Sequence, residues 1–355
     1  MALPVKTTTQ ASALKGLSMK VVRLYGPSDL RVSEEDCPIP GKGESLVRIT
    51  AVGICGSDLH RYVSGKNNQQ PLAHPLVLGH EFAGIAVTGP HKDKLVAVDP
   101  AISCGKCEWC KRGDVNLCPT LRFAGTNADD GALREFIVYP DSCLHPLPQG
   151  ISAAGGAVLE TLGVALHALD LSHVKPSDTL AILGAGPVGL LVFQGAKARG
   201  VKTVFVTETY AHRRLAAQKY GAKNIFQNQG AHETEEILKT TQGRGVDVVI
   251  EASGDTGAVD FALHILRRGG RIVQTGINAD DRTSFQSSLA RLKGATIVVQ
   301  RRMRALYPEA IRLVEQKKID VESIVSHKFP IAKTAEAFAL AVKRDGLKVV
   351  VEPWE

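Results

Sequence analysis

Four cysteines fall within one short segment and form the densest group of metal-binding side chains in the sequence. The segment SCGKCEWCKRGDVNLCP places Cys104, Cys107, Cys110 and Cys118 in a C-x2-C-x2-C-x7-C pattern. Four thiolates on such a loop bind one tetrahedral zinc ion with no open position, which stabilises the fold and performs no chemistry. An iron–sulfur cluster is the alternative, but its bacterial motif ends in an x3 spacing. The pattern therefore favours a structural zinc site.

A second group of metal-binding residue types is spread along the first third of the chain. Cys55 stands between two glycines in AVGICGSDLHRY, and His80 and Glu81 follow an apolar run in PLVLGHEFAG. A cysteine, a histidine and a carboxylate suit an open zinc site, whose fourth position takes water or substrate. A buried histidine and a loop cysteine without metal are the commoner arrangement. The spacing alone leaves both interpretations open.

A glycine-rich turn, Gly184-Ala-Gly-Pro-Val-Gly189, follows the apolar run TLAIL and precedes a segment of helical periodicity. A strand, a GxGxxG turn and a helix together bind the pyrophosphate of a dinucleotide at the helix N-terminus. Alternating strand-like and helix-like segments continue through LHILRRGG, expected to be helical, to the strand RIVQTG. This alternation predicts a doubly wound parallel sheet. The expected cofactor contacts are Gly184, Gly186, Pro187, Val188 and Gly189.

An acidic residue, Glu208, ends the next strand-like run, about twenty residues past the glycines. A carboxylate there accepts hydrogen bonds from the adenosine ribose and repels a 2′-phosphate, which favours NAD. Arg213 and Arg214 follow closely, and either could pair with a 2′-phosphate, so NADP stays open. We expect Glu208 and Arg213 in the cofactor site.

Length and charge set the wider expectations. With 355 residues, the chain exceeds what one hydrophobic core usually supports, so two domains are expected. The net charge is +7, but the basic residues are scattered, which argues against nucleic acid and favours an anionic small molecule. No signal peptide is recognised and no apolar run approaches the length of a membrane helix, so we expect a cytoplasmic protein without a membrane partner. Residues 1–18 are expected to be a flexible leader.

The order of the motifs is more specific than any one of them. GICGSDLH, GHEFAG, the four-cysteine segment, LETLGVALHA and the glycine-rich turn follow one another. The chain thereby resembles the medium-chain zinc-dependent alcohol dehydrogenases, in particular the sorbitol/polyol dehydrogenase branch, over nearly its whole length from about residue 19. The resemblance implies an α/β protein: a GroES-like β-rich catalytic domain (19–163 and 300–355) and a Rossmann NAD(P)-binding domain (164–299), assembled as a homotetramer or homodimer.

The same resemblance implies a catalytic zinc bound by Cys55, His80 and Glu81, with Glu160 beside the metal. One thiolate and one carboxylate cancel the charge of Zn²⁺ and leave an electrophilic centre, whereas a permanent fourth bond from Glu160 would make the site net negative. We therefore expect Glu160 to be an exchanging ligand or a close neighbour that yields to substrate. Two zinc ions per chain are expected, one catalytic and one structural.

Two further residues follow Cys55 in the same motif. Ser57 is expected to relay the proton of the alcohol, and His60 either shares that relay or contacts the cofactor ribose. The implied reaction is hydride transfer from a secondary alcohol to the nicotinamide, with zinc as a Lewis acid.

The identity of the substrate is the least determined property of the protein. In the segment VVQRRMRALYP, Arg302 stands where polyol dehydrogenases carry a substrate-binding arginine, and Met303 replaces the tyrosine that follows it. Arg301 and Arg304 crowd the same stretch, and arginine suits the bidentate binding of a carboxylate. The candidate substrate contacts are Tyr62, Phe123 and Arg302.

Several functions are therefore weighed. A polyol of the sorbitol or xylitol kind is favoured, with a sugar acid such as an aldonate or gulonate, threonine, or a simple diol as alternatives within the family. A zinc-free enone reductase would share the two domains but has no use for Cys55, His80, Glu81 or the cysteine segment. A non-enzymatic NAD-binding protein would not need these metal-binding residues either.

Overall fold

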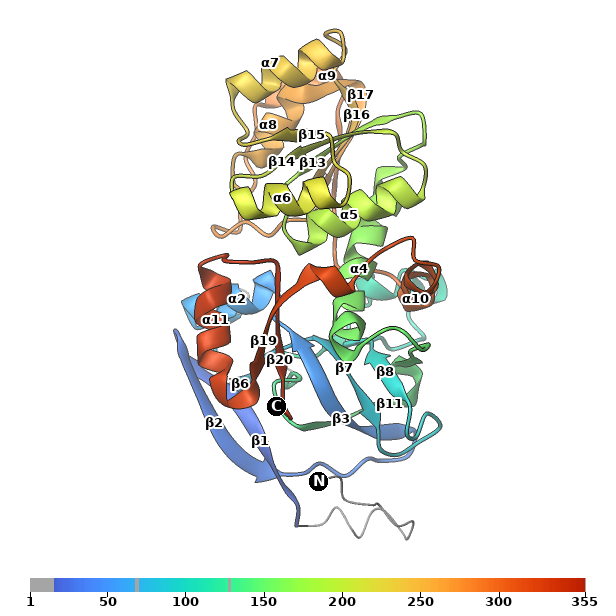
Figure 1. Ribbon diagram of the computed structural model, residues 1–355, viewed down its shortest axis with the longest axis vertical. Coiled ribbons are helices and arrows are strands. Elements are labelled where there is room, and N and C mark those ends of the chain that lie inside the picture. The colour runs from blue at the N-terminus through green and yellow to red at the C-terminus, as the bar shows by residue number, and fades with distance from the viewer. Residues whose placement is uncertain (1–15, 68–69, 127–128, 355) are drawn as a thin grey trace.

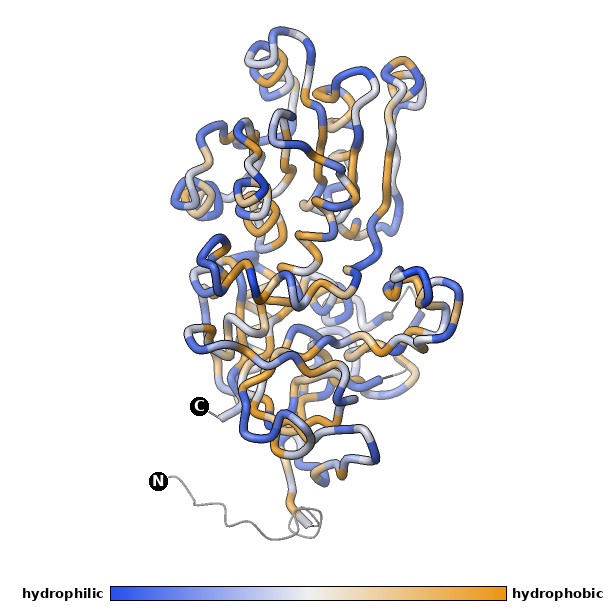
Figure 2. Tube along the Cα trace, turned by 90° about the vertical axis from the view of Figure 1, so that its right-hand side faces the viewer, coloured by the Kyte–Doolittle hydropathy of each residue, from blue (hydrophilic) through white to orange (hydrophobic). Residues whose placement is uncertain are grey.

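The computed structural model describes residues 16–67, 70–126 and 129–354. It has two lobes joined by one long helix, and the described chain begins and ends in the lower lobe (Figure 1). Hydrophobic segments run through both lobes (Figure 2), and the molecule has separate hydrophobic clusters. The leader expected at residues 1–18 lies almost wholly outside the described residues.

The lower lobe is built on a seven-stranded sheet in the order β12-β8-β7-β3-β20-β19, with β11 also paired to β3. Its strands are β3 (Glu44–Gly53), β7 (Glu81–Ala86), β8 (Leu95–Val98), β11 (Phe136–Pro140), β12 (Leu144–Pro146), β19 (Val325–Pro330) and β20 (Lys348–Glu352). The chain therefore returns to this sheet near its C-terminus, with β19 after helix α10 (Tyr307–Glu315) and β20 after helix α11 (Thr334–Val342). The closing helix and strand predicted there are α11 and β20.

Smaller strands complete the lower lobe. A three-stranded sheet contains β1 (Ser18–Gly26), β2 (Asp29–Asp36) and β6 (Leu76–Val77), and two-stranded pairs are formed by β4 (Lys66–Asn67) with β5 (Gln70–Pro71) and by β9 (Ala101–Ile102) with β10 (Arg122–Phe123). The helix α2 (Gly56–Ser64) follows β3 directly. It carries the residues that come after Cys55.

The upper lobe is a six-stranded parallel sheet in the order β15-β14-β13-β16-β17-β18. The strands are β13 (Thr179–Leu183), β14 (Thr203–Thr207), β15 (Asn224–Phe226), β16 (Val246–Glu251), β17 (Leu266–Gln274) and β18 (Thr296–Val299). The helices between them are α5 (Pro187–Ala198), α6 (Ala211–Lys219), α7 (Ala231–Thr240), α8 (Ala258–Ile265) and α9 (Ser287–Lys293). This is the doubly wound order, and it reverses between β13 and β16. The predicted fold class is confirmed.

One predicted boundary is wrong. The segment LHILRRGG was expected to be helical throughout, but α8 ends at Ile265 and β17 begins at Leu266. The pairing of β16 with β17 jumps from Val246–Leu266 to Val248–Arg271, so the intervening residues bulge from the sheet. Gly269, with φ +65°, adopts the left-handed backbone that this bulge requires.

The helix between the lobes, α4 (Ala153–Ser172), also departs from expectation. By length and composition it could cross a membrane, although no apolar run of that length was expected from the sequence. However, 83% of it is buried within the protein, where it packs on β3 and β7 of the lower lobe and on α5 of the upper lobe. Its apolar surface therefore belongs to the core. The domain boundary expected at residues 163 and 164 falls inside this helix, and the division into domains stays a prediction.

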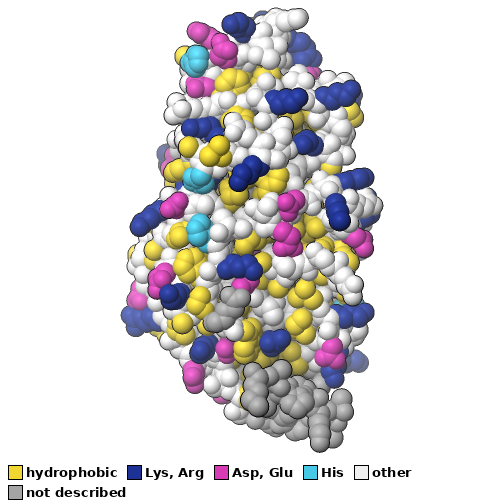
Figure 3. All heavy atoms as spheres, viewed as in Figure 1, with side chains coloured by type: hydrophobic (Ala, Val, Ile, Leu, Met, Phe, Trp, Pro, Cys, Tyr) yellow, Lys and Arg dark blue, Asp and Glu magenta, His cyan; other side chains and the backbone are white. Residues whose placement is uncertain are grey.

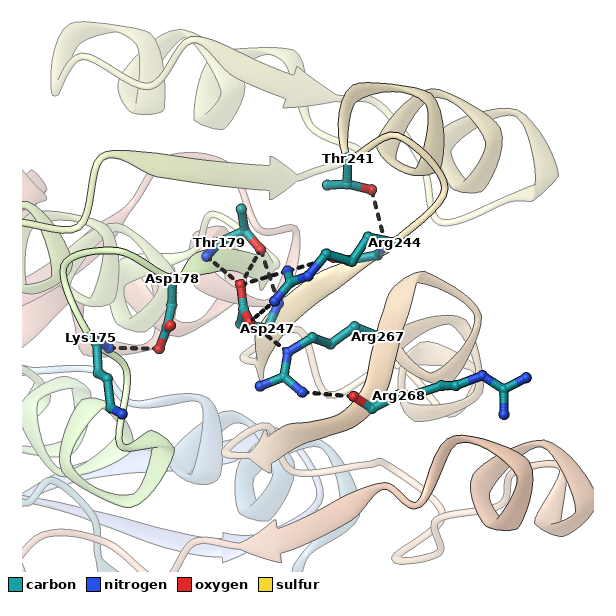
Figure 4. A network of polar contacts seen from close by, with 9 residues as sticks. Lys175, Asp178, Thr179, Thr241, Arg244, Asp247, Arg267 and Arg268 are labelled. Carbon is teal, nitrogen blue, oxygen red and sulfur yellow. Dashed lines mark hydrogen bonds and ion pairs between the residues drawn. The ribbon is translucent and has the colours of Figure 1, made fainter.

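The two ends of the parallel sheet differ in chemistry. At the amino end, Asp247 accepts hydrogen bonds from the backbone and hydroxyl of Thr179 at 2.9 and 2.8 Å and from the guanidinium groups of Arg244 and Arg267 (Figure 4). Burial alone would raise the pKa of Asp247, but these hydrogen bonds outweigh it and hold that pKa well below its usual range. This network ties β13, β16 and β17 together, away from the glycine turn.

The visible surface in Figure 3 intersperses lysine and arginine with acidic side chains. This distribution matches the scattered basic residues of the sequence.

Candidate active site and metal centres

Three predicted ligands converge where β3, α2 and β7 meet. Cys55 precedes the first turn of α2, His80 precedes β7, and Glu81 is the first residue of β7. Their ligand atoms all lie within 4.8 Å of one another. The β3–β7 pairing aligns Gly53 with Glu81, and a Cβ at Gly53 would collide with the Glu81 carboxylate. The glycine before Cys55 therefore makes room for the acidic ligand.

A buried lysine, which the sequence did not reveal, holds Glu81. The ammonium of Lys348, in β20, donates to both Glu81 carboxylate oxygens at 2.7 and 2.6 Å. Both residues are buried, with exposed fractions of 3% and 1%. The burial of Lys348 disfavours its charge, but Glu81 and Cys55 outweigh this and raise its pKa. Counting Zn²⁺, one thiolate, Glu81 and Lys348, the occupied site would carry one net positive charge.

A second missed residue, Asp58, touches both other ligands. Its carboxylate accepts the backbone N–H of Cys55 at 3.3 Å and lies 3.3 Å from Nδ1 of His80. A carboxylate on Nδ1 fixes the histidine ring and leaves Nε2 for a metal, a common arrangement around zinc ligands. Asp58 is fully buried, and the sequence hint was its place three residues after Cys55.

Glu160 lies outside this three-residue cluster among the described residues. It is buried in α4, and its Oε1 accepts a hydrogen bond from Nη2 of Arg302 at 3.2 Å. One of its two carboxylate oxygens is thus engaged by the arginine, and its part at the zinc stays a prediction. The geometry agrees with a neighbour that can exchange.

Phe123 joins the arginine to the ligands. Its ring centroid lies 3.7 Å from the guanidinium carbon of Arg302 and 5.0 Å from the ring of His80. Nε of Arg302 is buried and has no hydrogen-bond partner among the described residues. The structure thus brings Phe123 and Arg302 to the ligand cluster, with one donor of the guanidinium unused.

The remaining substrate candidates have other contacts. Tyr62 is buried in the lower core with its ring 5.1 Å from Phe338, so we withdraw it as a substrate contact. Met303 is buried against Gly163 of α4, where a Cβ would collide with its sulfur. Arg304 pairs with Asp114 at 2.7 Å. Of the clustered arginines with a described contact, Arg302 is the one at the ligand cluster.

The relay candidates lie on α2. Ser57 is partly buried and His60 is exposed. Although much of His60 is exposed, desolvation of the part that packs on the protein lowers its pKa, and the positive charges of Arg344 and Arg61 lower it further. The roles of both residues stay predictions.

The four cysteines form a compact second centre. Their sulfur atoms all lie within 4.8 Å of one another, as required for a single tetrahedral ion. The thiols titrate together: against the backbone N–H of Cys110, burial and the neighbouring cysteines raise the pKa of Cys107, whereas the backbone N–H groups of Lys106 and Cys107 lower the pKa of Cys104. A thiol that readily becomes a thiolate fits a zinc ligand.

A cleft of about 370 Å³ opens at the carboxyl end of the parallel sheet, where its strand order reverses. Its lining includes Gly184, Gly186, Glu208, Tyr210, Arg213, Ser253, Gly254, Asp255 and Arg344. Gly184 has φ +97°, and a Cβ at Gly189 would collide with the Gly184 carbonyl. Gly186 precedes the first turn of α5 and Pro187 occupies its start, so free N–H groups face the cleft. This cradle fits a dinucleotide pyrophosphate.

Glu208 and Arg213 both have partners in this cleft. The Glu208 carboxylate accepts the backbone N–H groups of Ala185 and Tyr210, each at 2.9 Å. Arg213 donates to the carbonyl oxygens of Gly346 and Arg344 at 3.2 and 3.4 Å, linking α6 to the lower lobe. Arg214, by contrast, bonds the carbonyls of residues 208 and 209 at the end of β14.

Glu251 is a buried acidic residue beside the cleft that the sequence did not single out. It ends β16 fully buried, and its Oε1 accepts the N–H groups of Ser253 and Gly254 and the Ser253 hydroxyl at 2.6 to 2.8 Å. Its Oε2 accepts the N–H of Gly276 at 3.1 Å. Burial raises the pKa of Glu251 against these hydrogen bonds. It therefore fastens two of the loops at the carboxyl edge, one of which lines the cleft.

Comparison with known proteins gives the same architecture. Residues 41–149 match the alcohol dehydrogenase GroES-like domain, and residues 187–316 match the zinc-binding dehydrogenase domain. The sorbitol dehydrogenase of Bacillus subtilis is 34% identical over 95% of this chain and 98% of its own length. The chain belongs to the zinc-dependent medium-chain alcohol dehydrogenases, in their polyol dehydrogenase branch. The probable D-xylulose reductase A of Emericella nidulans, 35% identical over 90% of this chain and 93% of its own, is another similar member.

Solved structures of this dehydrogenase family superpose closely. An alcohol dehydrogenase from Escherichia coli with NADH has a TM-score of 0.86 at 27% identity, covering 95% of this chain and all of its own. A zinc-binding dehydrogenase from Sinorhizobium meliloti with NADP has a TM-score of 0.86 at 30% identity, covering 95% of this chain and all of its own. L-idonate 5-dehydrogenase from Escherichia coli has a TM-score of 0.87 at 25% identity, covering 95% of this chain and 98% of its own.

Proposed function

We propose that this protein is a zinc-dependent polyol dehydrogenase that transfers a hydride from a secondary alcohol to NAD. The observation that carries the proposal is the convergence of Cys55, His80 and Glu81 within 4.8 Å. A structural core would not need a thiol, an imidazole and a carboxylate in contact, whereas an open zinc site does. A zinc-free enone reductase is disfavoured on the same ground.

The residues around the cluster have distinct tasks in this proposal. Cys55, His80 and Glu81 hold the zinc, which supplies Lewis-acid polarisation of the substrate oxygen when bound. Asp58 orients His80, and Lys348 fixes the carboxylate of Glu81. Ser57, with His60 as its alternative, passes the alcohol proton toward solvent.

Substrate selection is proposed to rest on Arg302 and Phe123. Arg302 keeps 17% of its side chain exposed beside Phe123, and its Nη2 lies 3.2 Å from Oε1 of Glu160, which neutralises its charge. A neutral polyol needs donors and acceptors but no net charge, so this pair suits it. The names of the sorbitol and D-xylulose relatives support the same class.

A sugar acid is the second candidate. The similarity to L-idonate 5-dehydrogenase favours it, and Arg302 could exchange Glu160 for a substrate carboxylate. That exchange would leave Glu160 as a buried unpaired charge, which is costly. The polyol therefore remains the primary proposal, and threonine and simple diols stay as comparison substrates.

The cofactor is proposed to bind in the cleft beside Gly184 and Glu208, with hydride acceptance by its nicotinamide. Glu208 favours NAD, since its carboxylate would repel a 2′-phosphate. NADP stays as the alternative, because the Sinorhizobium meliloti relative binds it and the guanidinium of Arg214, from α6, bonds the Glu208 carbonyl.

We also propose a homodimer or homotetramer in the cytoplasm. β18 is the edge strand of the parallel sheet, and Val299 on it is 72% exposed. An unpaired apolar edge is a template for pairing with a second copy.

The test follows reduced nicotinamide absorbance while sorbitol, xylitol, gluconate, threonine and 2,3-butanediol are each offered with NAD and NADP. We expect the highest kcat/KM for a polyol with NAD and a metal content of two zinc ions per chain. Preferential turnover of gluconate would favour the sugar acid. The absence of turnover with every alcohol, in zinc-loaded protein, would contradict the proposal.

A further inference from the structure

The backbone at Arg302 is unusual. Its φ of 50° lies in the left-handed region, which branched and long side chains rarely adopt. Such a residue is strained and persists only when its surroundings over-determine the conformation. Arg302 is also the residue proposed to contact substrate. What holds its backbone therefore determines where the guanidinium lies.

Both peptide groups that flank Arg302 are held by side chains from elsewhere. The carbonyl of Arg301, in the preceding peptide, accepts a hydrogen bond from Nδ2 of Asn116 at 2.8 Å. The carbonyl of Arg302, in the following peptide, contacts Nδ1 of His167 at 2.8 Å and accepts from Nε2 of Gln300 at 2.7 Å. The torsions of Arg302 are the rotations between these two peptide groups. With both planes fixed, the Cα–Cβ bond of Arg302 has one direction, and from it the guanidinium reaches the Phe123 ring.

Asn116 comes from the four-cysteine segment. It lies in the short helix Val115–Leu117, between Cys110 and Cys118, and is buried with 4% of its surface exposed. A neighbouring contact joins the same two segments, since Asp114 pairs with Arg304 at 2.7 Å. The third and fourth cysteines therefore bracket the loop that grips residues 301–304. A zinc ion held by the cysteines would fix both ends of that loop.

We propose that Asn116 is a positioning residue for substrate binding: it keeps Arg302 in its left-handed conformation and so directs the guanidinium toward the substrate. The four-cysteine loop thereby contributes to substrate recognition as well as to stability. The inference rests on the proposed function, in which Arg302 contacts the polyol. Without the Asn116 amide, Arg302 can relax to negative φ, and its side chain leaves the Phe123 ring.

The test compares Asn116→Ala and Asn116→Asp, the second of which keeps the shape of the side chain and replaces its donor by an acceptor. Both should raise the KM for the polyol by about tenfold, the effect of about one lost hydrogen bond. The KM for NAD and the two zinc ions per chain should stay unchanged. Glu108→Gln is the matched control, because Glu108 lies in the same segment in an exposed pair with Arg112. It should leave every parameter unchanged.

A double-mutant cycle with Arg302→Ala separates positioning from a general structural effect. Once Arg302 is gone, Asn116→Ala should raise the polyol KM no further. An unchanged KM in both Asn116 variants, beside a raised KM in Arg302→Ala, would overturn the inference and leave the proposed function intact. Additive effects would overturn it too. An unchanged KM in Arg302→Ala would remove the substrate role of that residue and the inference with it.

Discussion

At the scale of single residues, the candidate site divides into ligands found from the sequence and partners found only from the structure. Cys55, His80 and Glu81 lie in short motifs, so their types and neighbours were visible. Lys348 is 267 residues from Glu81 and meets it only because β20 pairs with β3. No local pattern marks such a lysine, since its place depends on sheet register.

The Lys348–Glu81 pair gives a prediction about metal and stability. Lys348→Met leaves Glu81 as a buried carboxylate without a counter-charge, which costs about 3 to 5 kcal/mol when one partner of a buried pair is removed. Bound zinc compensates much of that charge. The thermal midpoint of the variant should therefore fall strongly in chelated protein and less in zinc-loaded protein.

Lys239→Met is the control for that comparison. Lys239 pairs with Glu236 at 4.0 Å, both side chains are well exposed, and such pairs contribute about 0 to 1 kcal/mol. Its variant should show no dependence on zinc. Equal losses of stability for Lys348→Met with and without zinc would argue against Glu81 as a ligand.

Tyr62 is a residue that the sequence singled out and the structure places elsewhere. Tyr62 was a candidate substrate contact that follows Cys55 by seven residues. In the structure, its side chain instead packs in the lower core beside Phe338. Phe123 and Arg302, in contrast, lie beside the ligands as expected. The face of a helix is decided by packing, which spacing from one ligand does not specify.

At the scale of elements, the alternation of strands and helices was enough to predict the parallel sheet. Most of its strands are short apolar runs, and the segments between them have helical periodicity. The end of α8 was missed, since the bulge at residues 267–270 depends on pairing with β16. The loops at the carboxyl edge were expected from the glycine turn, but their fastening by Glu251 was not.

β16 carries an acidic residue near each end, and the two should respond differently to substitution. Glu251 fastens loops at the cofactor edge, with N–H and O–H donors as its described hydrogen-bond partners, whereas Asp247 is paired with two arginines at the opposite edge. Glu251→Gln should weaken the binding of both NAD and NADH by about tenfold.

The matched variant, Asp247→Asn, should lower the urea midpoint of unfolding and leave dinucleotide affinity within about twofold, because its network holds the sheet and not the cleft (Figure 4). Affinity is measured by calorimetry on zinc-loaded protein. Unaltered dinucleotide binding in a folded Glu251→Gln variant would exclude this role for Glu251.

At the scale of the whole molecule, the two lobes share α4, and further contacts close the structure around the cleft. Arg213 of α6 bonds the Gly346 carbonyl, and Gly346 lies two residues before Lys348. The cofactor cleft and the ligand cluster are therefore joined by one short stretch of chain. The order of motifs in the sequence predicted both lobes. The contact between Arg213 and Gly346, in contrast, depends on how the two lobes pack on each other.

The exposed edge of the parallel sheet gives a prediction about assembly. Val299→Lys places a charge on the edge strand β18, which opposes edge-to-edge pairing. The molar mass measured by light scattering should fall to that of a smaller species, with zinc content unchanged. Lys318→Ala, on the exposed surface after α10, serves as the control. An identical mass for wild type and Val299→Lys would place the interface elsewhere.

The central claim, a catalytic zinc held by Cys55, His80 and Glu81, is tested most directly by anomalous scattering at the zinc edge from crystals containing a polyol. The account predicts two peaks per chain, one among these three residues and one among the four cysteines, with Glu160 still directed to Arg302. Absence of the first peak, or a permanent bond from Glu160 to that zinc in the presence of substrate, would contradict it.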